Sequence, residues 1–302
     1  MPRHHAADGA PRSPIRGQTI TIEQQVTAMD TTLKRMQVNG IELTVLFAGE
    51  SNSGPTVLLV HGFPDDHTVW RNQIAPLVAA GYRVIAPDTR GCGDSEMPPR
   101  VSEYRVDKLV ADLVALLDAL NIGRVRLVAH DWGAVIGWRF VLAHPERTER
   151  YVALSVGHPN AYGQGGISQK LRGYYIVLLQ LRGIIEFLVT CFDWLGFRTM
   201  TRYPEEFPHW KASLSRPGRL TAGMNYYRAN PGMMFTKGLP AAQVPVSGIW
   251  SSGDRFLTEN QMRDSQKYVN GPWRYTRIEG GNHWMQLDVP DKLNPLLLDF
   301  LQ

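Results

Sequence analysis

The chain has 302 residues and a formal net charge of +4, with 43% hydrophobic and 20% charged residues. This length fits one large domain or two small ones, and the composition is typical of a globular protein. Lys and Arg are scattered without a basic run or stripe, which argues against a nucleic-acid partner, and no apolar run reaches the ~18 residues of a membrane span. Cys92 and Cys191 are too few for a disulfide framework, so the sequence favours a reducing, cytoplasmic setting.

Residues 1–31 differ in composition from the rest of the chain. They are rich in Pro, Gly, Ala and Arg, and they contain no apolar segment of the kind found in a secretory signal. We therefore expect a disordered tail, in which His4 and His5 are incidental.

From Thr32 onward, apolar runs alternate with amphipathic segments. Leu33–Val38 and Ile41–Phe47 flank Asn39-Gly40, a strong hairpin signal, and 56–60 is a continuous apolar run typical of a buried parallel strand. This alternation stops near Gly157, and the segment 160–238 contains helical stretches without a clear strand. Outside that stretch, the sequence predicts strands at 83–86, 125–129, 151–155, 244–250 and 274–278, and helices at 68–80, 106–120, 132–143, 259–268 and 295–301, the last capped by Asn294.

This order predicts an α/β fold with a mostly parallel central sheet and an inserted group of helices. The expected division is a first part of the core at 32–158, a helical cap at 159–238 and a second part of the core at 239–302. No internal repeat is present.

Asp131 stands where a predicted buried strand meets a helix. Ala129 and Gly133 flank it at two positions on either side, which is the pattern of a sharp turn that presents a nucleophile between strand and helix. An Asp in this place can also be a helix N-cap, and both interpretations stay open for this residue alone.

The segment His61-Gly62-Phe63-Pro64 directly follows the predicted strand 56–60. In a hydrolase built on such a sheet, the loop after this strand and the residue after the nucleophile each supply a backbone N–H to an oxyanion hole. The expected donors are therefore Phe63 and Trp132.

Two further polar residues follow later strands. Asp254 comes after the strand at 244–250, and His283 lies in Gly280-Gly281-Asn282-His283-Trp284 after the last strand. With Asp131 they give the chain order nucleophile, acid, histidine. Because the carboxyl ends of parallel strands meet at one edge of the sheet, we expect Asp131, Asp254 and His283 to form a triad.

Together these motifs resemble the epoxide hydrolases of the α/β-hydrolase superfamily, over nearly the whole chain beyond the tail. The matching segments are HGFP at 61–64, DTRGCGDS at 88–95, HDWG at 130–133, the Gly-Asp254 turn and GNHW at 281–284. The resemblance implies a helical cap carrying tyrosines that protonate the epoxide oxygen, and the matching position for one of them is Tyr227. A second tyrosine is usual in a segment similar to 174–180, but here Leu178 falls at its place, so Tyr175 or Tyr174 is the candidate substitute.

This family chemistry suits the residues present. A carboxylate at Asp131 can open a strained epoxide to an alkyl ester, and water activated by His283 can hydrolyse the ester to a vicinal diol, without metal or organic cofactor. The expected partners are an apolar epoxide and water, and a homodimer is left open. Two alternatives also stay open: a haloalkane or haloacid dehalogenase with the same Asp-His-Asp triad, and a ligand-binding homologue without turnover.

Overall fold

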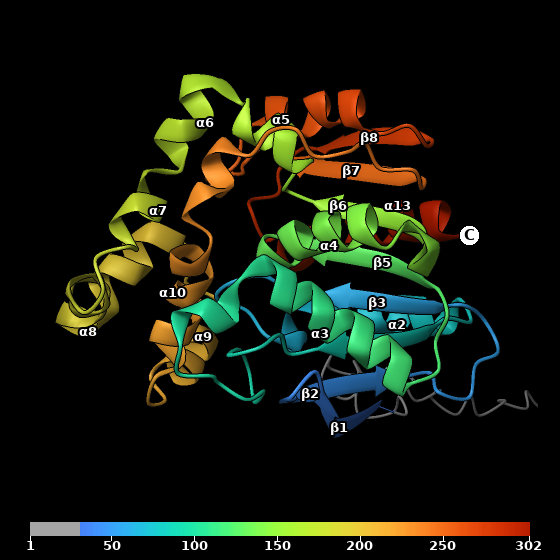
Figure 1. Ribbon diagram of the computed structural model, residues 1–302, viewed down its shortest axis with the longest axis horizontal. Coiled ribbons are helices and arrows are strands. Elements are labelled where there is room, and N and C mark those ends of the chain that lie inside the picture. Colours follow the sequence, from blue (N-terminus) through green and yellow to red (C-terminus); the bar gives the residue numbers. More distant parts are fainter. Residues whose placement is uncertain (1–30) are drawn as a thin grey trace, which may run out of the picture.

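The computed structural model describes residues 31–302, so the predicted tail lies outside the described residues except for Thr31. Eight strands form one twisted sheet in the order β1-β2-β4-β3-β5-β6-β7-β8 (Figure 1). The neighbours from β4 through β8 pair in parallel, while β1 and β2 are antiparallel additions at one edge. The strands are β1 (Thr31–Val38), β2 (Ile41–Ala48), β3 (Thr56–Val60), β4 (Arg83–Pro87), β5 (Val125–His130), β6 (Thr148–Leu154), β7 (Val246–Ser251) and β8 (Trp273–Ile278).

The first two strands form the predicted hairpin. Val38 pairs with Ile41 across a two-residue turn, and both Asn39 (φ 50°) and Gly40 (φ 72°) have positive φ. This is the conformation that Asn-Gly adopts at low cost in tight hairpins. By contrast β3 and β5 are buried between helices, which explains their nearly unbroken apolar sequences.

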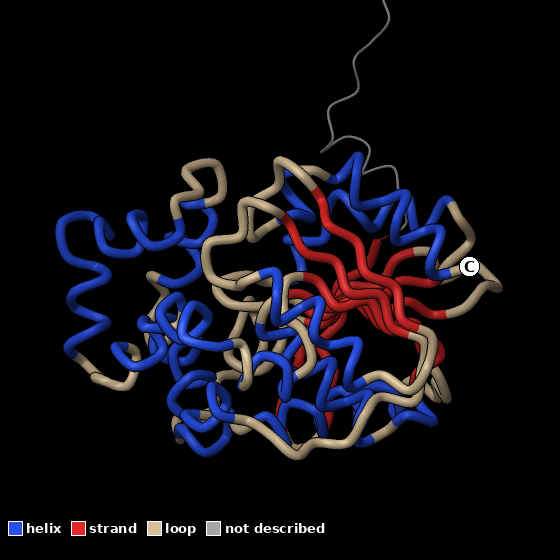
Figure 2. The backbone as a smooth tube through the Cα atoms, turned by 90° about the horizontal axis from the view of Figure 1, so that it is seen from above, coloured by secondary structure: helices blue, strands red, loops and turns tan. Residues whose placement is uncertain are grey.

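Helices cover both faces of the sheet (Figures 1 and 2). On one face α3 packs against α4, and on the other α2 packs against α13. Their bounds, with those of the short helices of the core, are η1 (His67–Trp70), α2 (Arg71–Ala79), η2 (Val101–Tyr104), α3 (Val106–Ala119), α4 (Trp132–Ala143), η3 (Pro145–Arg147), α11 (Glu259–Arg263), η5 (Asp264–Tyr268), α12 (Met285–Asp288) and α13 (Pro290–Leu301).

The prediction for the last helix was wrong at its start. Helix α13 begins at Pro290, and Pro295 lies inside it. Asn294 is not its N-cap: the side-chain amide donates to the Asn72 carbonyl (2.9 Å) and accepts from Gln73 Nε2 (3.0 Å). These bonds join α13 to α2, so the polar side chain serves packing between helices instead of the start of one.

The chain between β6 and β7 is helical, with no strand in the described residues 159–238. Figure 1 shows α6 to α10 beyond the strand arrowheads, on the side where the parallel strands end. We call α5 to α10 the cap helices; the division of the chain into domains stays a prediction. They are α5 (Pro159–Gly163), α6 (Gly166–Arg172), α7 (Tyr174–Leu178), α8 (Ile184–Thr201), α9 (Phe207–Leu214) and α10 (Arg219–Ala229), followed by η4 (Pro231–Phe235).

Among residues 31–302, no helix combines the length and the apolar character needed to cross a bilayer.

Candidate active site

Asp131 forms a strained turn between β5 and α4. Its φ of 51° and ψ of −122° are unfavourable for a residue with a side chain, so the surrounding packing must hold the turn in place. Asp131 occupies the N-cap position of α4, but its side chain makes no capping hydrogen bond with that helix. The carboxylate is therefore available for another purpose.

Gly133 allows the helix to start so close to the sheet. A Cβ at this position would lie 2.1 Å from the Val60 carbonyl oxygen and 2.6 Å from that of His61. Both neighbours are backbone atoms and cannot move aside independently of β3. The close approach of this backbone explains why the position after Trp132 must be a glycine.

We expect Gly133→Ala to lower the free energy of unfolding by about 1–3 kcal/mol, because the added methyl group must displace β3 or α4. The measurement is denaturant unfolding. Gly123→Ala is the matched control, since a Cβ there meets nothing within 4 Å. Equal stability of the two variants would contradict the close packing.

The HGFP loop lies directly against Asp131. The Phe63 N–H donates to Asp131 Oδ1 (3.0 Å), and a Cβ on Gly62 would lie 2.4 Å from Asp131 Cβ. His61 holds the loop from inside the protein: its Nδ1–H donates to the Gly62 carbonyl (2.8 Å), and its Nε2 accepts from the Thr89 N–H (3.0 Å). The loop therefore fixes Oδ1 of Asp131, while Oδ2 lies on the side of His283.

His283 lies between two carboxylates. Its Nε2 is 3.4 Å from Asp131 Oδ2, and its Nδ1–H donates to Asp254 Oδ2 (2.9 Å). The other Asp254 oxygen accepts from the N–H groups of Phe256 and Leu257, each at 2.9 Å, so the acid is fixed in turn. The three residues predicted from strand ends are together at the carboxyl edge of the sheet, and all three are buried.

The charges of this group reinforce each other. Burial opposes ionisation of His283, but Asp254 and Asp131 outweigh it and raise the pKa of the imidazole to about 10. Burial also opposes ionisation of Asp131, yet the adjacent His283 holds the pKa of this carboxyl below its usual value. Asp131 is therefore a carboxylate, and His283 an imidazolium, at neutral pH.

Two buried polar residues near the triad, His130 and Asp65, were not predicted as site residues from the sequence. The His130 Nε2–H donates to the His283 carbonyl (2.8 Å), and its Nδ1 accepts from Gln286 Nε2 (3.0 Å). Burial lowers the pKa of His130 to about 3, so it stays neutral and serves to position the His283 backbone. Asp65 accepts from the indole N–H groups of Trp210 (2.9 Å) and Trp284 (3.0 Å), which ties the HGFP loop to a cap helix and to the His283 loop.

A small cavity of about 30 Å³ opens directly above Asp131 and His283. Tyr227 contributes to it, with its ring in edge contact with Phe63 (6.1 Å between ring centres) and Tyr175 (5.9 Å). Burial and the nearby Asp131 charge raise the pKa values of both phenols well above the usual range, so both keep their protons. The lining consists of Phe63, Pro64, Asp131, Tyr175, Leu179, Phe197, Met200, Thr201, Tyr227, Phe256, His283 and Trp284.

The structure separates the candidates for a second phenol. Tyr175 lines the cavity, whereas Tyr174 is 60% exposed on the outside of α7 and Leu178 is 42% exposed. The resemblance of the segment 174–180 could not make this distinction, because α7 is only five residues long and small changes of register alter which side chain faces inward.

A larger cavity, about 260 Å³, lies beside the first but contains none of the triad. Trp132 and Tyr162 line it, together with apolar side chains such as Val135 and Val156. Trp132 follows Asp131 in sequence and its ring meets that of Tyr227 edge-on (5.0 Å between ring centres), but of the two cavities it lines the larger one. This cavity is larger than the one above Asp131, but the polar groups of the triad lie in the smaller one.

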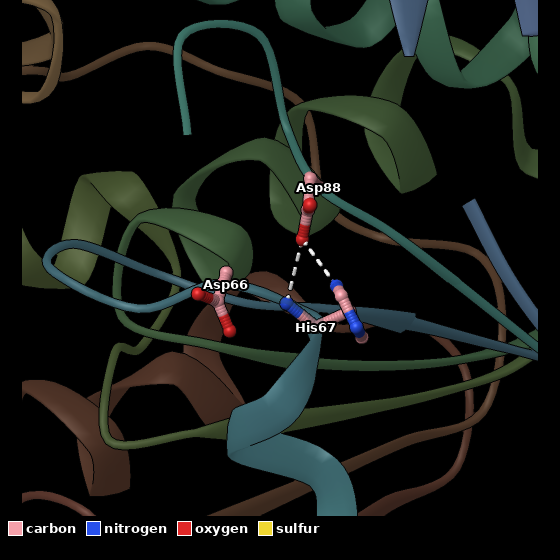
Figure 3. A group of neighbouring side chains, drawn as sticks. All are labelled: Asp66, His67 and Asp88. Carbon is pink, nitrogen blue, oxygen red and sulfur yellow. Dashed lines mark hydrogen bonds and ion pairs between the residues drawn. The ribbon is translucent and has the colours of Figure 1, made fainter. Parts of the chain in front are cut away.

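Asp66, His67 and Asp88 form a separate cluster whose side-chain ligand atoms lie within 4.8 Å of one another (Figure 3). Their atoms already have partners: Asp88 Oδ1 accepts from the His67 N–H (2.8 Å) and Nδ1–H (2.7 Å), and Asp66 accepts from Thr68 and His209. These bonds form a network that fixes the loop after β3, which explains why the three side chains lie together.

Comparison with known proteins agrees with this geometry. The family model of the alpha/beta hydrolase fold matches residues 55–174. Epoxide hydrolase A of Mycobacterium tuberculosis is 32% identical over 89% of this chain and 97% of its own length, and epoxide hydrolase 3 of Xenopus tropicalis is 31% identical over 89% and 77%. The chain belongs to the epoxide hydrolase family of α/β hydrolases.

Solved structures of this family are similar to the chain over most of its length. An epoxide hydrolase from Vigna radiata superimposes with a TM-score of 0.78 at 32% identity, covering 90% of this chain and 97% of that one. Epoxide hydrolase A from Mycobacterium thermoresistibile gives a TM-score of 0.77 at 28% identity, with 90% and 98% covered. The predictions of an α/β-hydrolase fold and of the family are confirmed.

Proposed function

We propose that this member of the family hydrolyses epoxides to vicinal diols, with Asp131 as the nucleophile. The observation that carries the proposal is the small cavity, in which the Asp131 carboxylate and the phenols of Tyr175 and Tyr227 meet. A carboxylate on one side of an epoxide and two acids on the other side supply what ring opening needs. The relatives named epoxide hydrolases support the same choice.

In the first step, Asp131 Oδ2 attacks one epoxide carbon and the C–O bond of the ring breaks. The oxygen that leaves takes a proton from Tyr227 or Tyr175, and the result is an alkyl ester on Asp131 together with a free hydroxyl group. The Phe63 N–H holds Oδ1, so the attacking oxygen is fixed in orientation.

In the second step, His283 removes a proton from a water molecule, which attacks the carbonyl carbon of the ester. The N–H groups of Phe63 and Trp132 stabilise the oxyanion that forms there. The intermediate then releases the diol and restores the Asp131 carboxylate. Asp254 keeps the imidazole oriented through its bond to Nδ1.

The change in charge of Asp131 explains how the protons return to their starting places. Esterification removes the negative charge of Asp131, one of the two that raise the pKa of His283. The imidazolium can then lose a proton, which replaces the one that the phenol gave to the alkoxide. His283 becomes a neutral base only after the ester has formed, when a base is needed.

A dehalogenase would instead need N–H donors for a departing halide. The Trp284 indole in the cavity donates its N–H to Asp65 (3.0 Å), and Trp132 lines the larger cavity and not this one. Phenols are thus the available acids beside Asp131. A homologue without turnover would keep this arrangement but fail to complete the second step.

The test is incubation of the protein with styrene oxide and, separately, with 1-chlorobutane. We expect diol from the epoxide and no halide from the chloroalkane. Halide release without diol would replace the proposal by dehalogenation, and a single labelling of Asp131 without steady-state product would identify a binding homologue.

Tyr175 is proposed as the second proton donor. Tyr175→Phe should lower kcat for epoxide hydrolysis by roughly 10²-fold, because only Tyr227 then protonates the departing oxygen. Tyr174→Phe is the matched control and should keep kcat within about twofold, since Tyr174 lies at the surface. Equal losses in the two variants would contradict the assignment.

We further propose a cytoplasmic location, supported by the presence of only two cysteines, neither of them in a disulfide. We also propose that the chain can assemble as a homodimer.

A further inference from the structure

The outer side of α6 to α8 is unusually apolar. Of the thirteen large hydrophobic side chains that are most exposed in the described part of the chain, eleven lie between Ile167 and Leu195. We call these eleven the apolar face; Phe187 (68% exposed) and Phe192 (84%) are prominent members. Figure 1 shows α6, α7 and α8 at the extreme of the molecule farthest from the C-terminus. Many exposed apolar side chains gathered in one part of the fold point to an interaction site.

The first turns of α8 carry part of the face on one side of the helix. Within α8, Ile184, Phe187 and Leu188 are exposed at intervals of three and four residues, which keeps them on one side of the helix. The opposite side is also apolar, because Ile176, Leu179, Ile185, Val189 and Phe197 are buried against the rest of the protein. A helix with apolar side chains on both its buried and its exposed side is unusual at a surface that meets only water.

Positive charge surrounds the face. The segment 166–202 has five basic residues and two acidic ones. Both acids are neutralised within the fold: Glu186 pairs with Arg228 (2.8 Å) and Asp193 with Lys211. Lys170, Arg182 and Arg202 are exposed and form no ion pair within residues 31–302.

A groove connects the apolar face with the candidate active site. It has a volume of about 870 Å³, and Ile167, Leu171 and Tyr174 of the face lie along it. At its inner end Tyr175, Met200 and Phe256 line both the groove and the small cavity above Asp131. The apolar face is therefore where an apolar molecule would enter.

We propose that the apolar face docks on the surface of a bilayer that contains anionic lipids. Aromatic and aliphatic side chains enter the boundary between headgroups and acyl chains, while Lys170, Arg182 and Arg202 meet the lipid phosphates. In this arrangement residues 31–302 lie on the membrane surface. A second copy fits this face less well, because a symmetric dimer would bring like charges together and close the groove.

Docking also gives the enzyme a source of substrate, an inference that rests on the proposed function. Epoxides with long apolar substituents concentrate in the bilayer. With the groove facing the lipid, such a molecule reaches the cavity above Asp131 without crossing water. The substrate class of this site is accordingly lipophilic epoxides dissolved in membranes.

The test is co-sedimentation of the full chain with vesicles of phosphatidylglycerol and phosphatidylcholine. We expect binding that weakens at high salt and on vesicles of phosphatidylcholine alone. The double variant Phe187→Ser/Phe192→Ser should bind at least about tenfold more weakly, and Arg182→Gln about fivefold more weakly. Leu33→Ser and Arg83→Gln are the matched controls, exposed residues outside the cap helices, and they should bind as the unaltered chain does.

Activity separates this inference from the proposed function. The double variant should hydrolyse a water-soluble epoxide at the unaltered rate, because Phe187 and Phe192 line neither the groove nor the cavity, and should lose most activity on an epoxide held in vesicles. Hydrolysis of the soluble epoxide without any vesicle binding would overturn the docking alone. Concentration-dependent dimers that the double variant abolishes, again without vesicle binding, would also overturn it and assign the face to a second copy. No hydrolysis of either epoxide would instead reject the proposed function.

Discussion

Asp131→Asn should lower kcat for epoxide hydrolysis by about 10⁴-fold or more, because it removes the nucleophile on which both proposed steps depend. The amide has nearly the shape of the carboxylate, and its oxygen can still accept the Phe63 N–H bond that Oδ1 accepts now. What it lacks is the negative charge of Oδ2 beside His283. Initial rates of diol formation measure the effect.

Two controls make that loss specific. Thermal unfolding should show that the variant folds, and Asp131→Ala should be equally inactive, which excludes slow conversion of the amide back to the acid. Activity within about tenfold of the unaltered protein in the Ala variant would mean that another group, or water itself, opens the epoxide.

His283→Gln should separate the two steps. We expect Asp131 to react with one equivalent of epoxide and the ester to persist, with the second step slowed by about 10³-fold, because glutamine cannot take a proton from water. Intact-mass measurement after mixing should show the chain plus one epoxide. The unaltered chain should show little adduct under the same conditions.

The double variant Asp131→Asn/His283→Gln is the control for that experiment and should show no adduct. An adduct in the double variant would place the reaction on another residue. A His283→Gln variant that keeps full turnover would remove His283 from the second step.

The order of strands and helices could be predicted from the sequence because the signals are local. Asn39-Gly40 determines a hairpin by backbone conformation alone, and the apolar run at 56–60 has the composition of a strand buried on both faces. The start of α13 could not be predicted in this way, since Asn294 has the local signature of a cap but makes its hydrogen bonds with α2.

The residues of the candidate site fall into the same two groups: those with a local sequence signal, and those whose placement depends on packing. Asp131, Asp254 and His283 follow strands whose carboxyl ends must meet at one edge, so their proximity could be expected before the structure. The inward direction of Tyr175, and the outward direction of Tyr174, depend on how a five-residue helix packs. His130 and Asp65 lie next to recognisable motifs, but nothing else in the sequence indicated their roles. Their hydrogen-bond partners are distant in the chain: Gln286 for His130, and Trp210 and Trp284 for Asp65.

The most direct test of a covalent Asp131 intermediate is a single turnover in water enriched in ¹⁸O, with enzyme in excess over epoxide. Water attacks the ester carbonyl in the proposed second step, so the diol of the first turnover should carry no ¹⁸O, and the peptide that contains Asp131 should gain it. A first-turnover diol that carries ¹⁸O, with an unlabelled Asp131 peptide, would show direct attack of water on the epoxide and contradict the account.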